Sequence, residues 1–462
     1  MSAINHSTLY IFIILLTIGT GCRQNKDSKS DSESMDVASL PLPEWAIKAN
    51  IYEVNIRQYT AEGNFNAFAA HLPRLKEMGV DILWFMPIFP ISSTRKKGTL
   101  GSYYAVSDFR ETNPEFGSKD DFRKIVSTAH DLGMKVILDW VPNHTGWDHV
   151  WISKHPDYYT KGSDGNITDP LNEHGQSMGW TDVADLNYDN QNMRSAMISD
   201  MLYWIEEFGI DGFRHDMALL VPLDFWKEVI TALRKVKPDI FMLAEAENHE
   251  LVNENTFHML YGWTLHHTLN DVAKGHKNVR AIDQWLQHER PKLRSGMYMH
   301  FTSNHDENSW SGSEIERMGD GYKAFAVLVN TFDGMPLTYS GQEEPMSKRL
   351  EFFEKDNIGF EKYQNKHLYS TLNQLRHEHP ALWHGDKQAP LVKTADHDHI
   401  FAFRRSHSGR NIHVLINLSN EIQKCNLNEP ITGKDIFSNV PVNLHSGSEI
   451  TLKPWEYMIV SD

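Results

Sequence analysis

The chain has few cysteines and no excess of basic residues. Of its 462 residues only Cys22 and Cys425 are cysteines. The formal net charge is −16, which argues against a nucleic acid as partner because a nucleic-acid surface needs clustered Lys and Arg. The 25 histidines show no metal-ligand spacing, so we predict no zinc site. The negative net charge is compatible with a neutral substrate. The sequence shows no internal repeat with the period of a solenoid protein.

A long apolar run is also lacking, and the longest candidate lies near the N-terminus. Residues 9–21 are apolar but too few to span a membrane, and a polar tract follows them. Their length matches the core of a secretory signal. The segment Thr20-Gly21-Cys22 resembles the end of a bacterial lipoprotein signal, although Met1–Thr8 holds no Lys or Arg and Gly19 replaces a larger aliphatic residue.

We therefore expect residues 1–22 to be a signal peptide and Cys22 to carry lipid. The protein would then be exported and held at the bacterial cell envelope, on the periplasmic face or the cell surface, and one lipid-modified end gives anchorage without spanning. Cys425 would have no disulfide partner. Residues 23–44, charged and Ser-rich for most of their length, are expected to form a disordered tether. An uncleaved apolar N-terminus or a misassigned start codon is the alternative.

From Trp45 onward, short β-rich runs alternate with longer helical patterns. Helices are expected within 120–132, 192–208 and 224–236. Eight strands alternating with helices predict a (β/α)₈ barrel at 45–383, whose active site forms at the C-terminal ends of the strands. The predicted strands are 51–56, 82–86, 135–141, 212–217, 241–245, 259–263, 298–303 and 337–340.

Two segments depart from this alternation. About fifty residues rich in Gly, Asp, His and Trp follow Val141, which suits a small domain of about 145–189 inserted at the active-site rim. After residue 383 the pattern changes to closely spaced strands, so 384–462 are expected to form a β-domain. Its predicted strands are 399–405, 412–417, 423–427, 449–453 and 457–460.

Polar clusters follow the third, fourth, fifth and seventh predicted barrel strands. The C-terminal ends of barrel strands share one rim, so these clusters are expected to converge on one mouth. They are Asp139 with Asn143 and His144, then Arg214 with Asp216, then Glu245, and finally His305 with Asp306.

The spacing of Arg214 and Asp216 indicates a nucleophile. Residues i and i+2 of a strand share a face, so the Arg214 guanidinium should lower the pKa of Asp216 and keep it ionised. Alone, this pattern is more often a structural ion pair. Glu245 follows an apolar run, where burial would raise its pKa and suit a general acid/base. Two such carboxylates carry out retaining glycoside hydrolysis, and Asp306 would stabilise the positive charge of the transition state.

These motifs resemble those of the α-amylase family of glycoside hydrolases (family 13). The similarity covers about residues 45–380 and lies in seven segments that occur in the family's order. They are Tyr103-Tyr104-Ala-Val-Ser-Asp108, Asp139-Trp-Val-Pro-Asn143-His144, Val183-Ala-Asp185-Leu-Asn, Gly212-Phe-Arg214-His-Asp216, Ala244-Glu245, Phe301-Thr-Ser-Asn304-His305-Asp306 and Gly334-Met-Pro336-Leu-Thr-Tyr-Ser-Gly341-Gln-Glu343.

The resemblance implies a barrel with a short domain B, a C-terminal antiparallel β-sandwich and an α-glucan or maltooligosaccharide substrate. It assigns Asp216 as nucleophile, Glu245 as acid/base and Asp306 as transition-state stabiliser. It implies no organic cofactor. It also implies a calcium ion, for which two residues match the family's ligands and the remaining ligands are not assigned. The residues that would bind the scissile sugar are Tyr104, His144, Arg214 and His305, and the calcium ligands are Asn143 and Asp185.

Two of these assignments, the acid/base and the ring beneath the sugar, each have a second candidate residue. Glu247 lies close enough to Glu245 to compete for the acid/base role, and Tyr103 competes with Tyr104 as the ring beneath the sugar. We favour Glu245 because it directly follows the apolar run. We favour Tyr104 by its distance from Asp108 in the motif.

The chain departs from the family pattern after the nucleophile. Endo-acting relatives usually place a Lys-His pair where Leu219 and Leu220 stand here, so starch-type endo-cleavage is in doubt. A glucan transferase or an α-glucosidase is the alternative activity, and a non-catalytic sugar-binding protein is a more distant one. Trp180 and Trp310 are candidates for sugar stacking or for packing. The pair His266-His267 is expected to cap a helix or to lie in the core.

Overall fold

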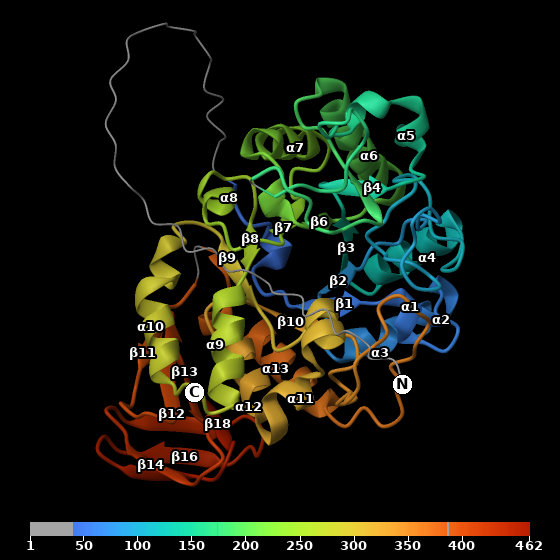
Figure 1. The fold of residues 1–462 in the computed structure, drawn as a ribbon. Helices are drawn as coiled ribbons and strands as arrows, with labels where there is room; N and C mark the ends of the chain where they lie inside the picture. The colour runs from blue at the N-terminus through green and yellow to red at the C-terminus, as the bar shows by residue number, and fades with distance from the viewer. Residues whose placement is uncertain (1–39, 173, 386–387) are drawn as a thin grey trace, which may run out of the picture. The chain divides into compact units, whose positions relative to one another are not determined.

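The computed structural model describes residues 40–172, 174–385 and 388–462 (Figure 1). These residues belong to a unit that extends over 37–462. The predicted signal peptide, Cys22 and most of the predicted tether lie outside the described residues. In the described part, no helix combines the length and the apolar character needed to cross a membrane.

Eight parallel strands close into a barrel, which confirms the predicted fold class. Their order around the barrel is β1-β10-β9-β8-β7-β6-β3-β2. Nearly every strand residue is buried, because helices cover the outside and side chains fill the inside. The strands are β1 (Ile51–Val54), β2 (Ile82–Phe85), β3 (Lys135–Trp140), β6 (Gly212–His215), β7 (Phe241–Ala244), β8 (Met259–Tyr261), β9 (Met297–His300) and β10 (Met335–Tyr339).

The strands end one to three residues earlier than predicted in most cases, and this places the acids just beyond them. Asp216 follows β6, and its N–H donates to the carbonyl of Trp140 at 2.8 Å. Glu245 follows β7, and its N–H donates to the carbonyl of His215 at 3.0 Å. Backbone hydrogen bonds therefore continue to the rim and fix where these two side chains begin.

The helices between the strands begin and end at residues with capping chemistry. Ser118 caps α4 in a capping box with Asp121. Gly209 ends α6 with a φ of 70°, a left-handed conformation that glycine adopts without strain. The helices are α1 (Ile56–Tyr59), α2 (Phe65–Ala69), α3 (Leu72–Glu77), α4 (Lys119–Asp131), α5 (Val150–Lys154), α6 (Gln191–Phe208), α7 (Leu223–Val236), α8 (Glu250–Asn253), α9 (Trp263–Ala273), α10 (Arg280–His288), α11 (Glu314–Met318), α12 (Tyr322–Thr331) and α13 (Lys366–Glu378).

The segment inserted after β3 contains a small antiparallel hairpin. Its strands, β4 (His144–Gly146) and β5 (Val183–Asp185), pair His144 with Asp185. A Cβ atom at Gly146 would lie 2.2 Å from Cβ of Ser92, so only glycine allows this approach. The close contact joins the hairpin to the loop that follows β2.

The C-terminal strands form two antiparallel sheets, as the predicted fold class requires. One sheet has the order β11-β12-β13-β18-β15-β16 and the other pairs β14 with β17. Cys425 lies buried in β14 as a free thiol. The strands are β11 (Leu391–Lys393), β12 (Ile400–His407), β13 (Arg410–Asn417), β14 (Gln423–Asn426), β15 (Ile431–Asp435), β16 (Pro441–Leu444), β17 (Glu449–Leu452) and β18 (Tyr457–Ser461).

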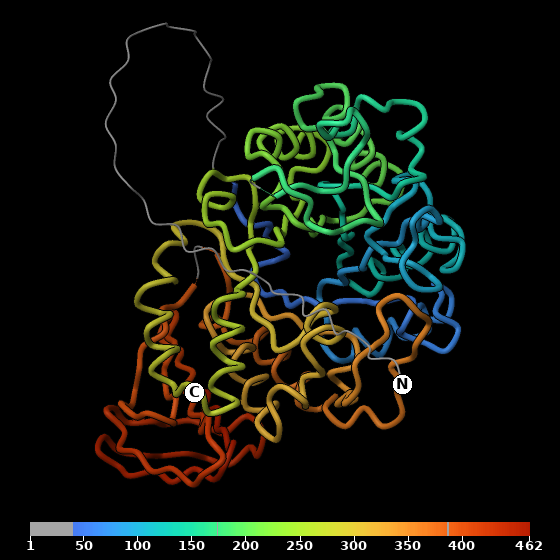
Figure 2. Tube along the Cα trace, in the orientation of Figure 1, coloured from blue at the N-terminus to red at the C-terminus, as the bar shows by residue number. Residues whose placement is uncertain are grey.

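The C-terminal sheets contact the barrel helices. In Figure 2 the red C-terminal trace lies beside the yellow segment of α9 and α10. The guanidinium Nε of Arg280, the first residue of α10, donates to Oδ1 of Asp398 at 2.8 Å. The N–H of Val279 donates to the carbonyl of Asp398 at 3.0 Å.

Three C-terminal strands, β11, β15 and β16, were not predicted, because they are short and carry polar residues or residues that break helices and strands.

Candidate active site

One buried guanidinium connects an acid within β3 to the acids that directly follow β6 and β7. Nη1 of Arg214 donates to Oδ1 of Asp139 at 2.7 Å and to Oδ1 of Asp216 at 3.1 Å. Its Nη2 lies 2.9 Å from Oε2 of Glu245. Register pairs Asp139 with Arg214 across β3 and β6, so the contact follows directly from the ladder. The structure thus brings Arg214, Asp216 and Glu245 together.

The turn after Asp216 also touches Glu245. Met217 has a φ of 44°, an uncommon conformation for a residue with a side chain. Its N–H donates to Oε2 of Glu245 at 2.8 Å. Backbone strain of this kind is concentrated at functional sites, and here it aims a backbone donor at a candidate catalytic carboxylate.

The pKa of Asp216 differs in direction from the expectation. Burial and the neighbouring Glu245 carboxylate raise the pKa of Asp216 well above its ordinary value, although Arg214 opposes this. Burial also raises the pKa of Asp139 to about 6, again against Arg214. Arg214 is one cation facing three carboxylates, so it does not offset their burial and mutual repulsion. Burial and the neighbouring carboxylates thus raise the pKa values of Asp139 and Asp216 together, and Arg214 opposes both shifts.

The two candidates for the acid/base lie in different surroundings. Glu245 contacts Arg214 and the N–H of Met217, as described above. Oε2 of Glu247 instead accepts hydrogen bonds from the N–H and the hydroxyl of Thr264, at 2.9 and 2.5 Å. Burial raises the pKa of Glu247 to about 7. The geometry favours Glu245, because it is the one placed beside Asp216.

The two tyrosines also separate clearly. The hydroxyl of Tyr104 donates to Oδ2 of Asp139 at 3.0 Å and lies 2.7 Å from Nε2 of His305. The hydroxyl of Tyr103 donates to Asn55 at 3.2 Å, and its ring lies beneath Arg57. Tyr104 is therefore the ring that reaches the acids.

A buried glutamate, Glu53, forms an ion pair with the imidazole of His305. Nδ1 of His305 lies 2.5 Å from Oε1 of Glu53, and Nε2 lies 3.4 Å from Oδ2 of Asp306. Burial opposes the charge on His305, but the Asp306 and Glu53 carboxylates raise its pKa to about 9. His305 and Asp306 thus join the same cluster through Tyr104.

The sequence motifs missed Glu53, Trp84 and Tyr261. Nε1 of Trp84 donates to Oδ2 of Asp139 at 3.2 Å, and the hydroxyl of Tyr261 accepts from Nε of Arg214 at 3.1 Å. Glu53 had a signal, since it is the one charged residue of its predicted strand. The other two are polar-tipped aromatic residues within apolar strands and carried no separate signal.

His144 reaches the site from the inserted hairpin of β4 and β5. Burial lowers the pKa of His144 to about 4, so its imidazole is neutral at ordinary pH, and it hydrogen-bonds to the backbone of Tyr104. The ring of Trp180 meets it edge-on at 5.8 Å between centroids. Asn143 lies beside it, with Nδ2 3.2 Å from Nδ1 of His144.

Asn143 and Asp185 offer only part of a calcium site. Burial raises the pKa of Asp185 to about 6, and no basic side chain in the described ranges forms an ion pair with it. A half-buried carboxylate without a basic partner suits a cation, although Thr160 already donates a hydrogen bond to it. Calcium prefers six to eight oxygens, and the described residues contain no cluster of three or more His, Cys, Asp or Glu that would hold a metal.

The remaining sequence candidates lie around this cluster. Leu219 and Leu220 form a 3-10 turn, Ala218–Leu220, just after the acid, and Leu219 is 55% exposed. His266 takes the core role: it is buried within α9, and its Nε2 lies 2.9 Å from Oε2 of Glu307.

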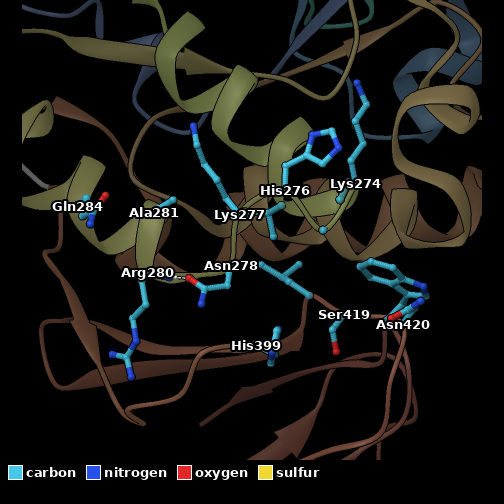
Figure 3. Close-up of a pocket in the computed structure, with 15 residues that line it drawn as sticks. Lys274, His276, Lys277, Asn278, Arg280, Ala281, Gln284, His399, Ser419 and Asn420 are labelled. Carbon is cyan, nitrogen blue, oxygen red and sulfur yellow. Dashed lines mark hydrogen bonds between the residues drawn. The ribbon is translucent and has the colours of Figure 1, made fainter.

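A separate hollow of about 660 Å³ lies between α10 and the C-terminal sheet. It contains none of the acids. Figure 3 shows that Lys274, His276 and Lys277 extend to one side of it whereas Arg280 extends to the other. These basic side chains do not converge on a ligand.

Comparison with known proteins shows which families and structures the chain is similar to. The family model described as "Alpha amylase, catalytic domain" matches residues 24–423. A maltogenic alpha-amylase of Bacillus acidopullulyticus is 25% identical over 432 residues, covering 86% of this chain and 70% of that protein. Alpha-amylase 3 of Dictyoglomus thermophilum is 26% identical over 461 residues, covering 85% of this chain and 89% of its own. The crystal structure of a maltogenic alpha-amylase from Thermotoga neapolitana superposes with a TM-score of 0.81 at 28% identity, covering 90% and 99% of the two chains.

Proposed function

This chain belongs to the α-amylase family and is a glycoside hydrolase acting on O-glycosyl bonds, and from that premise we propose that it cleaves α-glucosidic bonds in short maltooligosaccharides. The observation that carries the proposal is the contact of one guanidinium, Arg214, with Asp139, Asp216 and Glu245. It gathers a nucleophile and an acid in one buried cluster.

In the first step Asp216 attacks the anomeric carbon while the bond to the leaving oxygen breaks. Glu245 gives its proton to that oxygen, and a covalent glycosyl-enzyme forms. In the second step Glu245 takes a proton from water, the water oxygen bonds to the anomeric carbon, and the Asp216 carboxylate departs. Asp306 and His305 hold sugar hydroxyls and oppose the positive charge that develops on the ring.

The test replaces Asp216 by Asn, which preserves shape and removes the nucleophile. We expect hydrolysis of maltotriose to fall by about 10⁴-fold or more, by analogy with the loss of other catalytic nucleophiles. Glu247→Gln serves as the control, because its carboxylate contacts Thr264 and not the cluster. Wild-type turnover by Asp216→Asn would refute the mechanism.

The preference for short substrates rests on Leu219 and Leu220. Both side chains are apolar, and the exposed one, Leu219, offers no side-chain hydrogen bond to a sugar beyond the scissile bond. Transfer to a sugar acceptor is the second candidate activity, since a relative named 4-alpha-glucanotransferase in Thermotoga neapolitana is 27% identical over 328 residues. Products decide between them: glucose and maltose indicate hydrolysis, and chains longer than the substrate indicate transfer.

Calcium and the lipid anchor are further proposals. Asn143 and Asp185 would supply two oxygens to a structural calcium, and a rise in melting temperature with CaCl₂ that Asp185→Asn abolishes would support it. Lipidation of Cys22 would hold the enzyme at the envelope. Globomycin-sensitive processing in a bacterial host would support the anchor, and an unlipidated product would contradict it.

A further inference from the structure

A row of aromatic rings leads from Tyr104 out of the site. The ring of Phe352 lies nearly parallel to that of Tyr104, 6.4 Å between centroids and 10° between planes. The ring of Trp310 lies 5.2 Å from Phe352 and 5.9 Å from Phe353. Tyr104 is buried, whereas Trp310 is 53% exposed. The row thus connects the proposed sugar platform to an aromatic surface open to solvent.

Hydrogen bonds between two loops hold Trp310 in place. Trp310 lies in a short π-helical segment, Glu307–Ser311. The N–H of Leu350 donates to Oδ1 of Asn308 at 2.8 Å, and Nδ2 of Asn308 donates to the carbonyl of Lys348 at 3.1 Å. The hydroxyl of the next residue, Ser309, donates to the carbonyl of Leu350 at 3.0 Å. A surface fixed before binding loses little conformational entropy when a ligand arrives.

Two cations of the loop before Phe352 are already paired. Lys348 lies 2.5 Å from Asp356, and Arg349 lies 3.1 Å from Glu316. The surface therefore suits a neutral ligand that offers an apolar face. A pyranose ring has such a face in its axial C–H groups, and indole is an aromatic ring with a large apolar face and a polar edge.

The topology determines which part of a substrate reaches Trp310. Trp310 follows β9 and Phe352 follows β10, whereas Asp216 and Glu245 follow β6 and β7, and β8 separates these two pairs of strands in the closed barrel. Glu245 is proposed to protonate the leaving oxygen, so the leaving group lies toward β6 and β7. The portion of the chain that remains attached to the nucleophile extends toward Trp310.

We propose that Trp310, backed by Phe352, forms a subsite that stacks on the second glucose residue of the part transferred to Asp216. This inference rests on the proposed function and specifies its substrate as an α-linked glucose oligomer with at least two residues on that side. The leaving-group side presents Leu219 instead. Substrate is therefore held mainly through the glycosyl part.

The test compares p-nitrophenyl α-maltoside with p-nitrophenyl α-glucoside. Only the maltoside places a second glucose against Trp310. Removing the ring in Trp310→Ala is expected to lower kcat/KM for the maltoside by about 2- to 13-fold, the range of one aromatic stacking contact, and to leave kcat/KM for the glucoside unchanged. Trp310→Phe should restore most of the loss. Ile422→Ala, which truncates an exposed apolar residue of the C-terminal domain, is the matched control.

Equal losses on both substrates, or no loss on either, would overturn the subsite. If the wild type hydrolyses neither substrate, the proposed function fails, and the subsite is then judged by binding. Calorimetry on Glu245→Gln with maltotriose is expected to show an affinity that falls by a similar factor when Trp310→Ala is added. Unchanged affinity in that pair would overturn the inference independently of catalysis.

Discussion

Replacing Glu53 by Gln should move the alkaline limit of activity to lower pH. The hydroxyl of Tyr104 gives its proton to Asp139, so it can only accept from Nε2 of His305. Nδ1 of His305 faces Glu53, which is an acceptor when ionised. Both ring nitrogens are then donors, and the ring is an imidazolium. Burial raises the pKa of Glu53, but His305 has carboxylates on both sides, which favours the charged form.

The magnitude follows from the loss of one charge-assisted hydrogen bond. Such bonds contribute about 1.5–3 kcal/mol, and one pKa unit corresponds to about 1.4 kcal/mol. The pKa of His305, about 9 in the wild type, should therefore fall by roughly one to two units in Glu53→Gln. The neutral side chain of Gln keeps the shape and an acceptor oxygen, which limits other changes.

The assay is the pH dependence of kcat/KM on maltotriose between pH 5 and 10. In the wild type the alkaline limb should lie near pH 9, and in Glu53→Gln it should lie near neutrality. Glu449→Gln, which breaks an exposed ion pair with Lys424, controls for a general change of charge. An alkaline limb that stays in place while the variant remains folded would refute the role of Glu53.

The stability of the fold should also fall as the pH rises, in the same direction as activity. The pKa of His305 is raised above its unfolded value, so its contribution is fully present below about pH 6.5 and is lost as the pH rises through about 9. Wild-type melting temperature should fall across that window by more than that of Glu53→Gln. Parallel curves for the two proteins would argue against a stabilising ion pair.

Three more predictions concern the scaffold and the substrate. Gly146→Ala should lower the melting temperature by several degrees, because its Cβ would collide with Ser92, and an unchanged melting curve would contradict the close approach. Ser118→Ala should cost about 1 kcal/mol in urea unfolding through loss of the α4 cap, and no change in the midpoint would show that the capping box is dispensable. Leu219→Lys combined with Leu220→His should raise kcat/KM on amylose relative to maltotriose, and a constant ratio would show that this turn does not select chain length.

The barrel could be predicted because its signals are local. Each strand is a short apolar run, and each long helix has a periodic apolar face, as in α6 and α7. Strands β15 and β16 were missed because Gly433 and Pro441 interrupt short, largely exposed segments whose pairing depends on the rest of the sheet. Local pattern carries little information about such partly exposed strands.

The convergence of the acids was predictable from the sequence, whereas the contacts of Glu53, Trp84 and Tyr261 and the electrostatics of the site were not. Strand ends placed Asp216, Glu245 and Asp306 at one rim, and the sequence could show that Arg214 shares a face with Asp216. It could not show that Arg214 also contacts Asp139 and Glu245, because those contacts depend on barrel register. The expected lowering of the pKa of Asp216 was wrong because burial and the neighbouring Glu245 carboxylate outweigh Arg214.

The sharing of Arg214 has a consequence for engineering. A substitution at Asp139, Asp216 or Glu245 frees part of the guanidinium and changes the proton affinity of the two carboxylates that remain. Effects of paired substitutions will then depart from the product of the single ones. Nucleophile strength and acid strength are thus one adjustable property of this cluster, and neither can be altered by itself.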